Sequence, residues 1–211
     1  RAVKGAILAL VVVAPLQVYL GDGLGRVVAT DQPAALAAME GHYHTRNPDG
    51  TPNTNWKVVG WPNAKGDGMA WSISIPHVLS LLETHTWNSA VSGLDDFPAN
   101  QRPPVVIPFY AFRVMVAAGG ALMLLAFWGL YLALRGKLSA ARIAQQRWFL
   151  RATIFAAFLP YISIWCGWWV REIGRQPWVV YGLMRTSDGV SHMGVGEAVV
   201  WPVSYTHLTL P

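Results

Sequence analysis

The chain has 211 residues, of which 53% are hydrophobic and only 13% are charged. A soluble domain carries about 25% charged residues, so this composition excludes an ordinary soluble domain and predicts a membrane protein. The net charge of +5 lies beside apolar runs, which favours anionic lipid headgroups over nucleic acid as its partner. The single cysteine, Cys166, excludes a disulfide framework or a cysteine-based metal site within the chain.

The first expected spanning helix is Ala2–Leu20, in which Lys4 is the only charge. About 20 helical residues cross a bilayer core of about 30 Å, and this segment is long enough. The run begins directly after Arg1 and no signal-peptide pattern precedes it, so we expect the chain to be incomplete at this end.

A long polar stretch, residues 21–106, follows and is expected to be an ordered loop outside the membrane. Proline and glycine punctuate it, which predicts turns rather than one long helix. Pro33–Gly41 reads as a short helix, because proline suits a first helical turn and glycine a helix end. A loop of this length is more often functional than idle.

Two further spanning helices are expected at 107–134 and 149–173, joined by the connector 135–148. The connector contains four basic residues and no acidic ones, so the positive-inside rule places it in the cytoplasm and residues 21–106 outside. The fold class is therefore an all-α, multi-spanning transmembrane helix bundle with a long extracytoplasmic loop. The alternative is a set of buried helices in a large soluble protein.

The end of the chain divides into three expected parts. Residues 174–194 should return to the outer side, and 195–202 should begin a truncated fourth span. Residues 203–211 (VSYTHLTLP) resemble translated adapter read-through at the ends of environmental gene fragments, so we assign them no role, His207 included.

Three residues within the spans could carry chemistry. An ionisable group at membrane depth is costly, which makes Arg113 a functional candidate, although a snorkelling arginine is the simpler alternative. Met115 is ambiguous, since methionine usually packs but a thioether can also bind haem iron. Glu172 shares one helical face with Trp168 and Arg175 if the helix continues that far. Such a carboxylate could bind a metal or carry protons, or belong to a solvated aromatic belt.

Several motifs together resemble the large subunit of cytochrome bd-type quinol oxidases. Residues 167–178 (GWWVREIGRQPW) are similar to the family signature GWxxxExGRQPW, and Phe112–Met115 (FRVM) resembles its FRxM segment. Gly21–Gly25 (GDGLG) and Leu36–Gly41 (LAAMEG) resemble the start of its quinol-binding loop. The order and spacing agree over most of the chain, which would correspond to the second half of that subunit.

The resemblance implies roles for individual residues. Met115 would be an axial ligand of a low-spin haem b, with Arg113 beside that haem. Glu172 would bind a high-spin haem b, and Trp168 would lie on the electron route between haems. Three residues would support the haem group from the outer side: Arg175, Gln176 and Trp178. The third haem would be haem d or another b-type haem, and the histidine ligands of the family lie outside this sequence.

Glu40 would accept a proton or a hydrogen bond from the quinol hydroxyl. The family loop usually has a lysine five residues before this glutamate, where this chain has Ala35. Four histidines of the loop match no ligand position and are expected to be surface or loop histidines: His42, His44, His77 and His85.

The implied parent protein oxidises membrane quinol, reduces dioxygen to water and builds a proton gradient across the bacterial cytoplasmic (inner) membrane. It would pair with a homologous integral subunit II and a small accessory subunit, without nucleic acid. The fragment alone is expected to be inactive. The alternatives are a related haem protein with another electron donor, suggested by Ala35, and an unrelated transporter or structural membrane protein.

Overall fold

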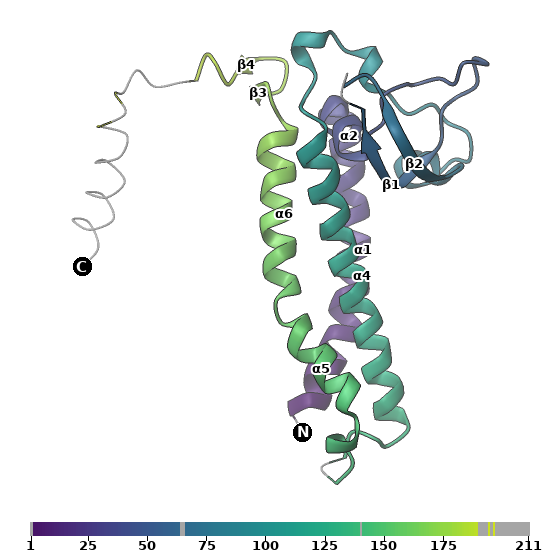
Figure 1. Cartoon of the computed structure of the whole chain (residues 1–211), viewed down its shortest axis with the longest axis vertical. Coiled ribbons are helices and arrows are strands. Elements are labelled where there is room, and N and C mark those ends of the chain that lie inside the picture. Colours follow the sequence, from purple (N-terminus) through teal and green to yellow (C-terminus); the bar gives the residue numbers. More distant parts are fainter. Residues whose placement is uncertain (1, 64–65, 140, 190–193, 195, 197–211) are drawn as a thin grey trace.

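Three long helices stand side by side and carry a folded loop at one end (Figure 1). The computed structural model describes residues 2–63, 66–139, 141–189, 194 and 196. The predicted fourth span at 195–202 and the tail at 203–211 therefore lie almost entirely outside the described residues. The mainly helical architecture predicted from the sequence is confirmed, with two small antiparallel sheets added to it.

The first spanning helix, α1 (Ala2–Asp31), is longer than predicted. The prediction ended it at Leu20 and began the loop at residue 21, and both boundaries are wrong. Glycines weaken this stretch by about 1 kcal/mol each, but Asp22 and Arg26 form an ion pair one helical turn apart, at 3.3 Å. Val28 then packs against the hydrophobic core of the loop. Tertiary packing therefore extends the helix beyond its apolar run.

The second spanning helix, α4 (Val106–Leu134), agrees with the predicted segment 107–134 to within one residue. It lies at the centre of the bundle and packs on both α1 and the third span. Gly129 permits a close approach, because a Cβ atom there would lie 3.0 Å from Ile7 and 3.2 Å from Phe149. These two side chains belong to a small hydrophobic core at the connector end of the bundle.

The third span consists of two helices, α5 (Arg147–Ala156) and α6 (Leu159–Gly174), rather than the single helix predicted at 149–173. Pro160 explains the break. Proline lacks a backbone N–H, and its ring collides with the carbonyl group four residues earlier, which here belongs to Ala156. The prediction of a spanning segment still holds, because Arg147–Gly174 taken together is long and apolar enough to cross a membrane.

The loop forms a compact cap on the ends of α1 and α4. Its elements are the following: α2 (Pro33–Glu40), β1 (Trp56–Pro62), β2 (Met69–Ile75), α3 (Val78–Thr84), and the short 3-10 helices η1 (Leu94–Asp96) and η2 (Ala99–Gln101). Strands β1 and β2 pair antiparallel. The predicted helix at Pro33–Gly41 is confirmed, and Gly41 ends it in the left-handed conformation with φ of 61°.

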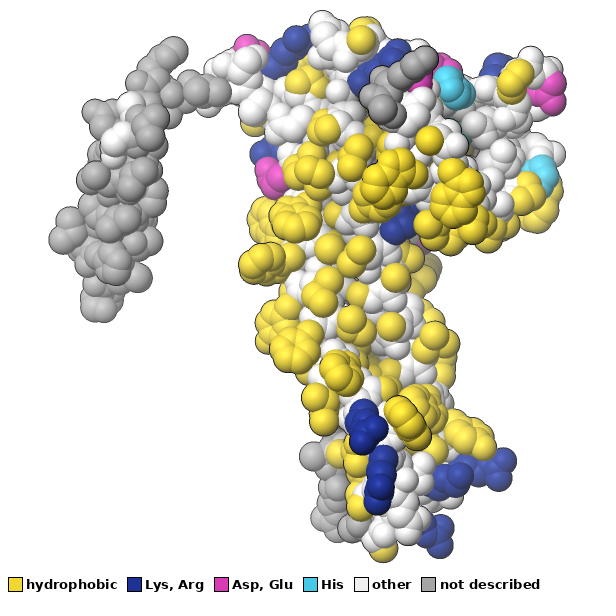
Figure 2. All heavy atoms as spheres, in the orientation of Figure 1, with side chains coloured by type: hydrophobic (Ala, Val, Ile, Leu, Met, Phe, Trp, Pro, Cys, Tyr) yellow, Lys and Arg dark blue, Asp and Glu magenta, His cyan; other side chains and the backbone are white. Residues whose placement is uncertain are grey.

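The opposite end of the bundle carries the basic connector, which contains the 3-10 helix η3 (Ile143–Gln145). After α6 the chain forms a second small sheet from β3 (Trp178–Val180) and β4 (Met184–Arg185), near the loop end of the bundle (Figure 1). Hydrophobic side chains cover the shaft between the two ends, and Lys and Arg gather at the connector end (Figure 2). An exposed apolar belt bounded by polar ends is the surface expected of a membrane-spanning protein.

Candidate functional site

Arg113 of α4 holds the loop onto the helix bundle. Its Nη2 atom lies 2.7 Å from Oε2 of Glu40, the last residue of α2. Its Nη1 donates a hydrogen bond of 2.7 Å to the carbonyl oxygen of Met39, and its Nε donates one of 3.1 Å to the carbonyl oxygen of Lys57 in β1. The guanidinium also lies 4.3 Å from the ring centre of Phe109. Within this structure Arg113 is thus neither free nor snorkelling.

The Arg113–Glu40 pair is largely withdrawn from solvent, with exposed side-chain fractions of 14% for Arg113 and 5% for Glu40. A buried charge is tolerated only when it is paired and hydrogen-bonded, as both of these are. The pair joins two residues that the sequence analysis treated as separate sites, one for quinol and one for haem. Neither of those roles is tested by this geometry.

Lys57 contributes a second cation near the same carboxylate, and the sequence analysis gave it no role. Burial lowers the pKa of its ammonium to about 8, while the Glu40 carboxylate acts in the opposite direction. The expected loop lysine is replaced by Ala35, on the first turn of α2. Lys57 therefore supplies a positive charge near Glu40 from β1 instead. Its only sequence signal is its position in a tryptophan-rich segment.

Met115 faces the third span rather than the lipid. Its Sδ atom lies next to Gly167 of α6, and a Cβ atom added to that glycine would be 3.5 Å from the sulfur. Met115 follows Arg113 by two residues, a rotation of about 200° around a helix. Arg113 accordingly faces the loop, and Met115 faces α6. The contact is compatible with packing as well as with a ligand role, so the predicted role stays a prediction.

Glu172 lies in the last turn of α6, which continues as far as the sequence argument required. Its Oε2 atom lies 2.5 Å from Nη2 of Arg175, and the two side chains are 41% and 35% exposed. The backbone carbonyl of Glu172 accepts a hydrogen bond of 3.1 Å from the Gln176 side-chain amide. The Gln176 amide oxygen accepts a bond of 2.6 Å from Thr186, which fastens the β3–β4 segment to the helix end.

The two predicted tryptophans occupy different surroundings. Trp168 is 59% exposed on α6, so its indole is available to contact lipid, another subunit or a cofactor. Trp178 begins β3, where the Arg185 guanidinium lies 5.3 Å from its ring centre and Tyr181 packs edge-on at 6.1 Å. Trp178 thus belongs with Arg175 and Gln176 to the cap over the end of α6, whereas Trp168 lies on its outer surface.

The donor set fits a haem better than a free metal ion. No group of three or more His, Cys, Asp or Glu side chains that could hold an ion occurs among the described residues. A haem iron needs few ligands from the protein, and Met115 and Glu172 could each supply one, to two different haems. In addition, Nε of Arg175 is buried without a hydrogen-bond partner, and an anionic propionate group would supply one. The residues present are therefore compatible with the expected cofactor.

His42 is a loop histidine that lies in the interior of the loop rather than at its surface. It is fully buried in the loop, and its Nε2 lies 3.1 Å from the carbonyl oxygen of Val91. Burial lowers its pKa to about 4. The prediction of surface or loop histidines therefore holds for both neighbours, with His42 buried in the loop and His44 exposed on it.

Comparisons with known proteins agree with the helical architecture. The family described as Cytochrome bd terminal oxidase subunit I matches residues 1–210. The chain is 33% identical over 169 residues to Cytochrome bd ubiquinol oxidase subunit 1 of Bacillus subtilis (strain 168), covering 76% of this chain and 34% of the relative. It is 28% identical over 243 residues to Cytochrome bd-II ubiquinol oxidase subunit 1 of Escherichia coli (strain K12), covering 84% and 46%.

A solved structure extends the likeness to three dimensions. The bd oxidase from Geobacillus thermodenitrificans matches with a TM-score of 0.74 and 26% identity, over 98% of this chain and 46% of that one. The chain spans less than half the length of these relatives.

Proposed function

This chain belongs to the cytochrome bd terminal oxidase subunit I family, and from that premise we propose that it forms part of a quinol:oxygen oxidoreductase. The complete enzyme oxidises membrane quinol, passes the electrons to dioxygen through haem groups, and generates a proton gradient. The observation that carries the proposal is the arrangement on α4, where Arg113 binds the loop carboxylate Glu40 and Met115 faces α6 two residues later.

In this proposal the loop binds the quinol and the helix bundle binds the haems. Glu40 receives the proton or the hydrogen bond of the quinol hydroxyl in the loop. Met115 and Glu172 would hold the low-spin and the high-spin haem b, respectively, and Trp168 would assist electron transfer between the haems. The haems supply the one-electron chemistry, and the protein sets their position and their access to protons.

Positive charge completes the proposed site. Arg113 lies on α4, the helix that carries Met115, and compensates the negative charge of the loop carboxylate Glu40. Arg175, with its unpartnered Nε, is placed to hold an anionic group at the end of α6, and Gln176 and Trp178 fix that end in position.

The proposed orientation places the basic connector 135–148 in the cytoplasm and the loop, now residues 32–105, on the outer side of the bacterial cytoplasmic membrane. The two lie at opposite ends of the bundle (Figure 1). The proposed partners are a homologous integral subunit II, a small accessory subunit, and the lipid that covers the apolar belt.

An absorption spectrum tests the haem assignment. The complete subunit that carries this sequence is co-expressed with its partner subunit, and the reduced-minus-oxidised spectrum of Met115→Leu is compared with that of wild type. Leucine keeps the volume and removes the sulfur ligand, so we expect the low-spin haem signal to be lost or shifted. Met123→Leu on the same helix is the matched control and should leave the spectrum unchanged.

Glu172→Gln should in the same way alter the high-spin haem signal, with quinol-dependent oxygen consumption lost. A wild-type protein that binds no haem would overturn the proposed function. A normal spectrum in Met115→Leu would overturn only the ligand assignment.

A further inference from the structure

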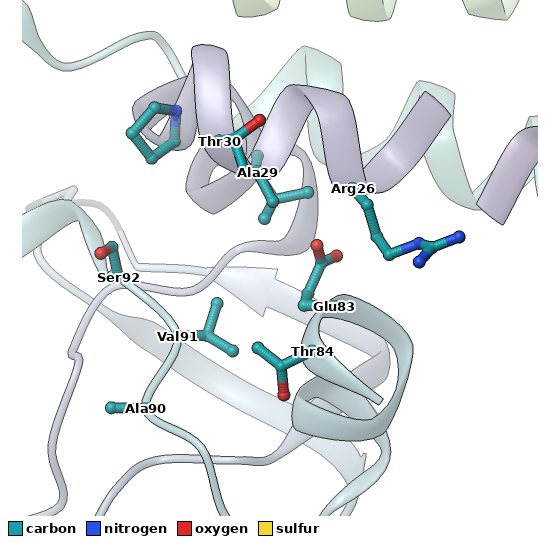
Figure 3. Close-up of a pocket in the computed structure, with 10 residues that line it drawn as sticks. Arg26, Ala29, Thr30, Glu83, Thr84, Ala90, Val91 and Ser92 are labelled. Carbon is teal, nitrogen blue, oxygen red and sulfur yellow. The ribbon is translucent and has the colours of Figure 1, made fainter. Parts of the chain in front are cut away.

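A cavity of about 360 Å³ opens between the end of α1, the start of α2, α3 and residues 90–92 of the loop (Figure 3). Its volume lies in the range of about 300–1,000 Å³ that is usual for small-molecule sites. Most of the wall is apolar, and five polar side chains also line it: Arg26, Thr30, Glu83, Thr84 and Ser92. The lining residues that matter below are Arg26, Leu36 and Glu83.

Glu83 is the polar group that lacks a partner in this cavity. It lies near the end of α3, and in Figure 3 its carboxyl group points into the space between α3 and α1. The Oε2 atom is buried and has no hydrogen-bond partner. Leaving a buried polar atom unsatisfied costs about 1–3 kcal/mol, so such an atom calls for an explanation.

The neighbouring charges do not neutralise Glu83. Asp22 of α1 pairs with both nearby basic side chains, since it lies 3.3 Å from Nη2 of Arg26 and 3.4 Å from Nε2 of the His85 ring. Figure 3 shows the Arg26 guanidinium directed away from the Glu83 carboxyl group. Glu40 adds a further negative charge one helical turn beyond the cavity-lining Leu36.

The protonated form of Glu83 is favoured as a result. Burial raises the pKa of this carboxyl group to about 8, with Glu40 and Asp22 adding to the shift. A carboxylic acid that is neutral at pH 7 can donate an O–H hydrogen bond, which a carboxylate cannot. The cavity thus combines a mainly apolar wall with a carboxyl group that can donate a hydrogen bond and whose Oε2 atom is buried.

We propose that Glu83 is a substrate-binding residue that donates a hydrogen bond to an oxygen of a quinone or quinol head group held in this cavity. This inference rests on the proposed function and adds a residue to it. A neutral ring that carries oxygen substituents suits the surroundings, because most of the wall is apolar and it holds the Glu83 carboxyl group, whose Oε2 atom has no hydrogen-bond partner. An anionic ligand does not suit them, because Arg26, the cation that lines the cavity, is already paired with Asp22.

The test measures steady-state kinetics of the complete, haem-loaded oxidase with decylubiquinol. Glu83→Ala removes the donor and should raise KM about 5- to 10-fold with little change in kcat, as expected for one hydrogen bond to a neutral group. Glu83→Gln keeps an N–H donor in the same shape and should stay within about 3-fold of wild type. Asp31→Asn, an exposed carboxylate at the end of α1, is the control and should not change KM.

The pH profile separates a binding role from a structural one. Above about pH 8 wild-type Glu83 loses its proton, so it can no longer donate and KM should rise. Glu83→Gln should lack this rise, although Arg26 still lines the cavity and three other titratable residues, Asp22, His85 and Glu40, remain in the elements packed around it. Infrared difference spectra recorded on adding decylubiquinol should show a shift in the C=O band of a protonated carboxylic acid. The shifted band should be absent in Glu83→Gln and present in Asp31→Asn.

The outcomes for Glu83 and for the proposed function are distinguishable. Unchanged KM and an unchanged carboxyl band in Glu83→Ala, with wild-type oxidase active, overturn the assignment of Glu83 and leave the oxidase function intact. A haem-loaded wild-type protein that does not oxidise decylubiquinol overturns both. Equal increases in KM in Glu83→Ala and Asp31→Asn would show a general effect of altering the loop and also overturn the assignment.

Discussion

The guanidinium of Arg113 and the carboxylate of Glu40 form a 2.7 Å ion pair that connects the second spanning helix to the first helix of the loop. The same guanidinium donates hydrogen bonds to two loop carbonyl groups, those of Met39 and Lys57. One side chain therefore ties both α2 and β1 to α4. The folded loop depends on this helix as much as on its own small core.

Arg113→Gln should destabilise the docked loop by about 3–5 kcal/mol, because it leaves Glu40 as a buried charge without its partner. We expect faster proteolysis within residues 32–105 and a lower midpoint of thermal unfolding. Arg135→Gln removes an exposed arginine at the other end of α4 and is expected to change stability by less than about 0.5 kcal/mol. Equal effects of the two substitutions would contradict the docking role.

His42 should make the loop less stable in acid. Its pKa in the folded protein, about 4, lies below the unfolded value of 6.5. The stability it contributes is therefore present above pH 6.5 and is lost as the pH falls toward 4, by at most about 3 kcal/mol. Glu83 has a raised pKa, so the stability that it contributes is present below pH 4.5 and is lost as the pH rises to about 8.

The contributions of His42 and Glu83 to stability change with pH in opposite directions. Thermal unfolding should therefore be measured for wild type and His42→Gln in parallel between about pH 7 and about pH 5. The difference in stability between the two proteins should shrink as the pH falls. His44→Gln, which alters an exposed ring, serves as the control. A difference that does not vary with pH would disprove the account of His42.

Gly41→Ala should destabilise the loop more than Gly50→Ala, although both glycines have a positive φ, of 61° and 81°. Backbone strain costs about 1–2 kcal/mol at either position. Only at Gly41 would the new Cβ atom also collide with neighbours, Met69 and the Phe109 ring, the latter at 2.8 Å. Overpacking adds about 1–3 kcal/mol. Comparing the midpoints of thermal unfolding of the two variants isolates the destabilisation due to steric overlap at Gly41. Equal midpoints would show that the overlap has no such effect.

Pro160→Ala should make α5 and α6 one continuous helix. Alanine restores a backbone N–H that can bond to the carbonyl of Ala156, and it removes the ring that now blocks that bond. Hydrogen exchange of the amides at 157–159 should slow by at least about 10-fold in detergent-solubilised protein, which corresponds to about 1.4 kcal/mol. Unchanged exchange there would mean that packing, rather than the proline, breaks the helix.

The sequence predicted the elements whose formation depends on local pattern. The length and apolarity of α4 set its ends to within one residue, and Pro33 and Gly41 marked the limits of α2. The end of α1 was wrong, because the contacts that extend it to Asp31 come from residues distant in sequence, such as Leu36 and Leu79. Hydropathy carries no information about such contacts.

The candidate site was predicted only in part for the same reason. The motif GRQPW identified the cap over α6, and the helix did continue to Glu172 as its spacing required. The ion pair between Arg113 and Glu40 joins residues far apart in the chain, so no spacing rule could have revealed it. Lys57 and Glu83 have no distinguishing motif, and only their burial in the folded loop singles them out.

Arg113 and Met115 emerge on opposite sides of a single helix, one toward the loop and one toward α6. Because α4 is one continuous helix, a rotation about its long axis that weakens the contact between Arg113 and Glu40 would also move the Met115 thioether away from Gly167. A change at the Arg113–Glu40 contact in the loop is thus coupled to a change at the Met115–Gly167 contact in the bundle, because α4 carries both Arg113 and Met115.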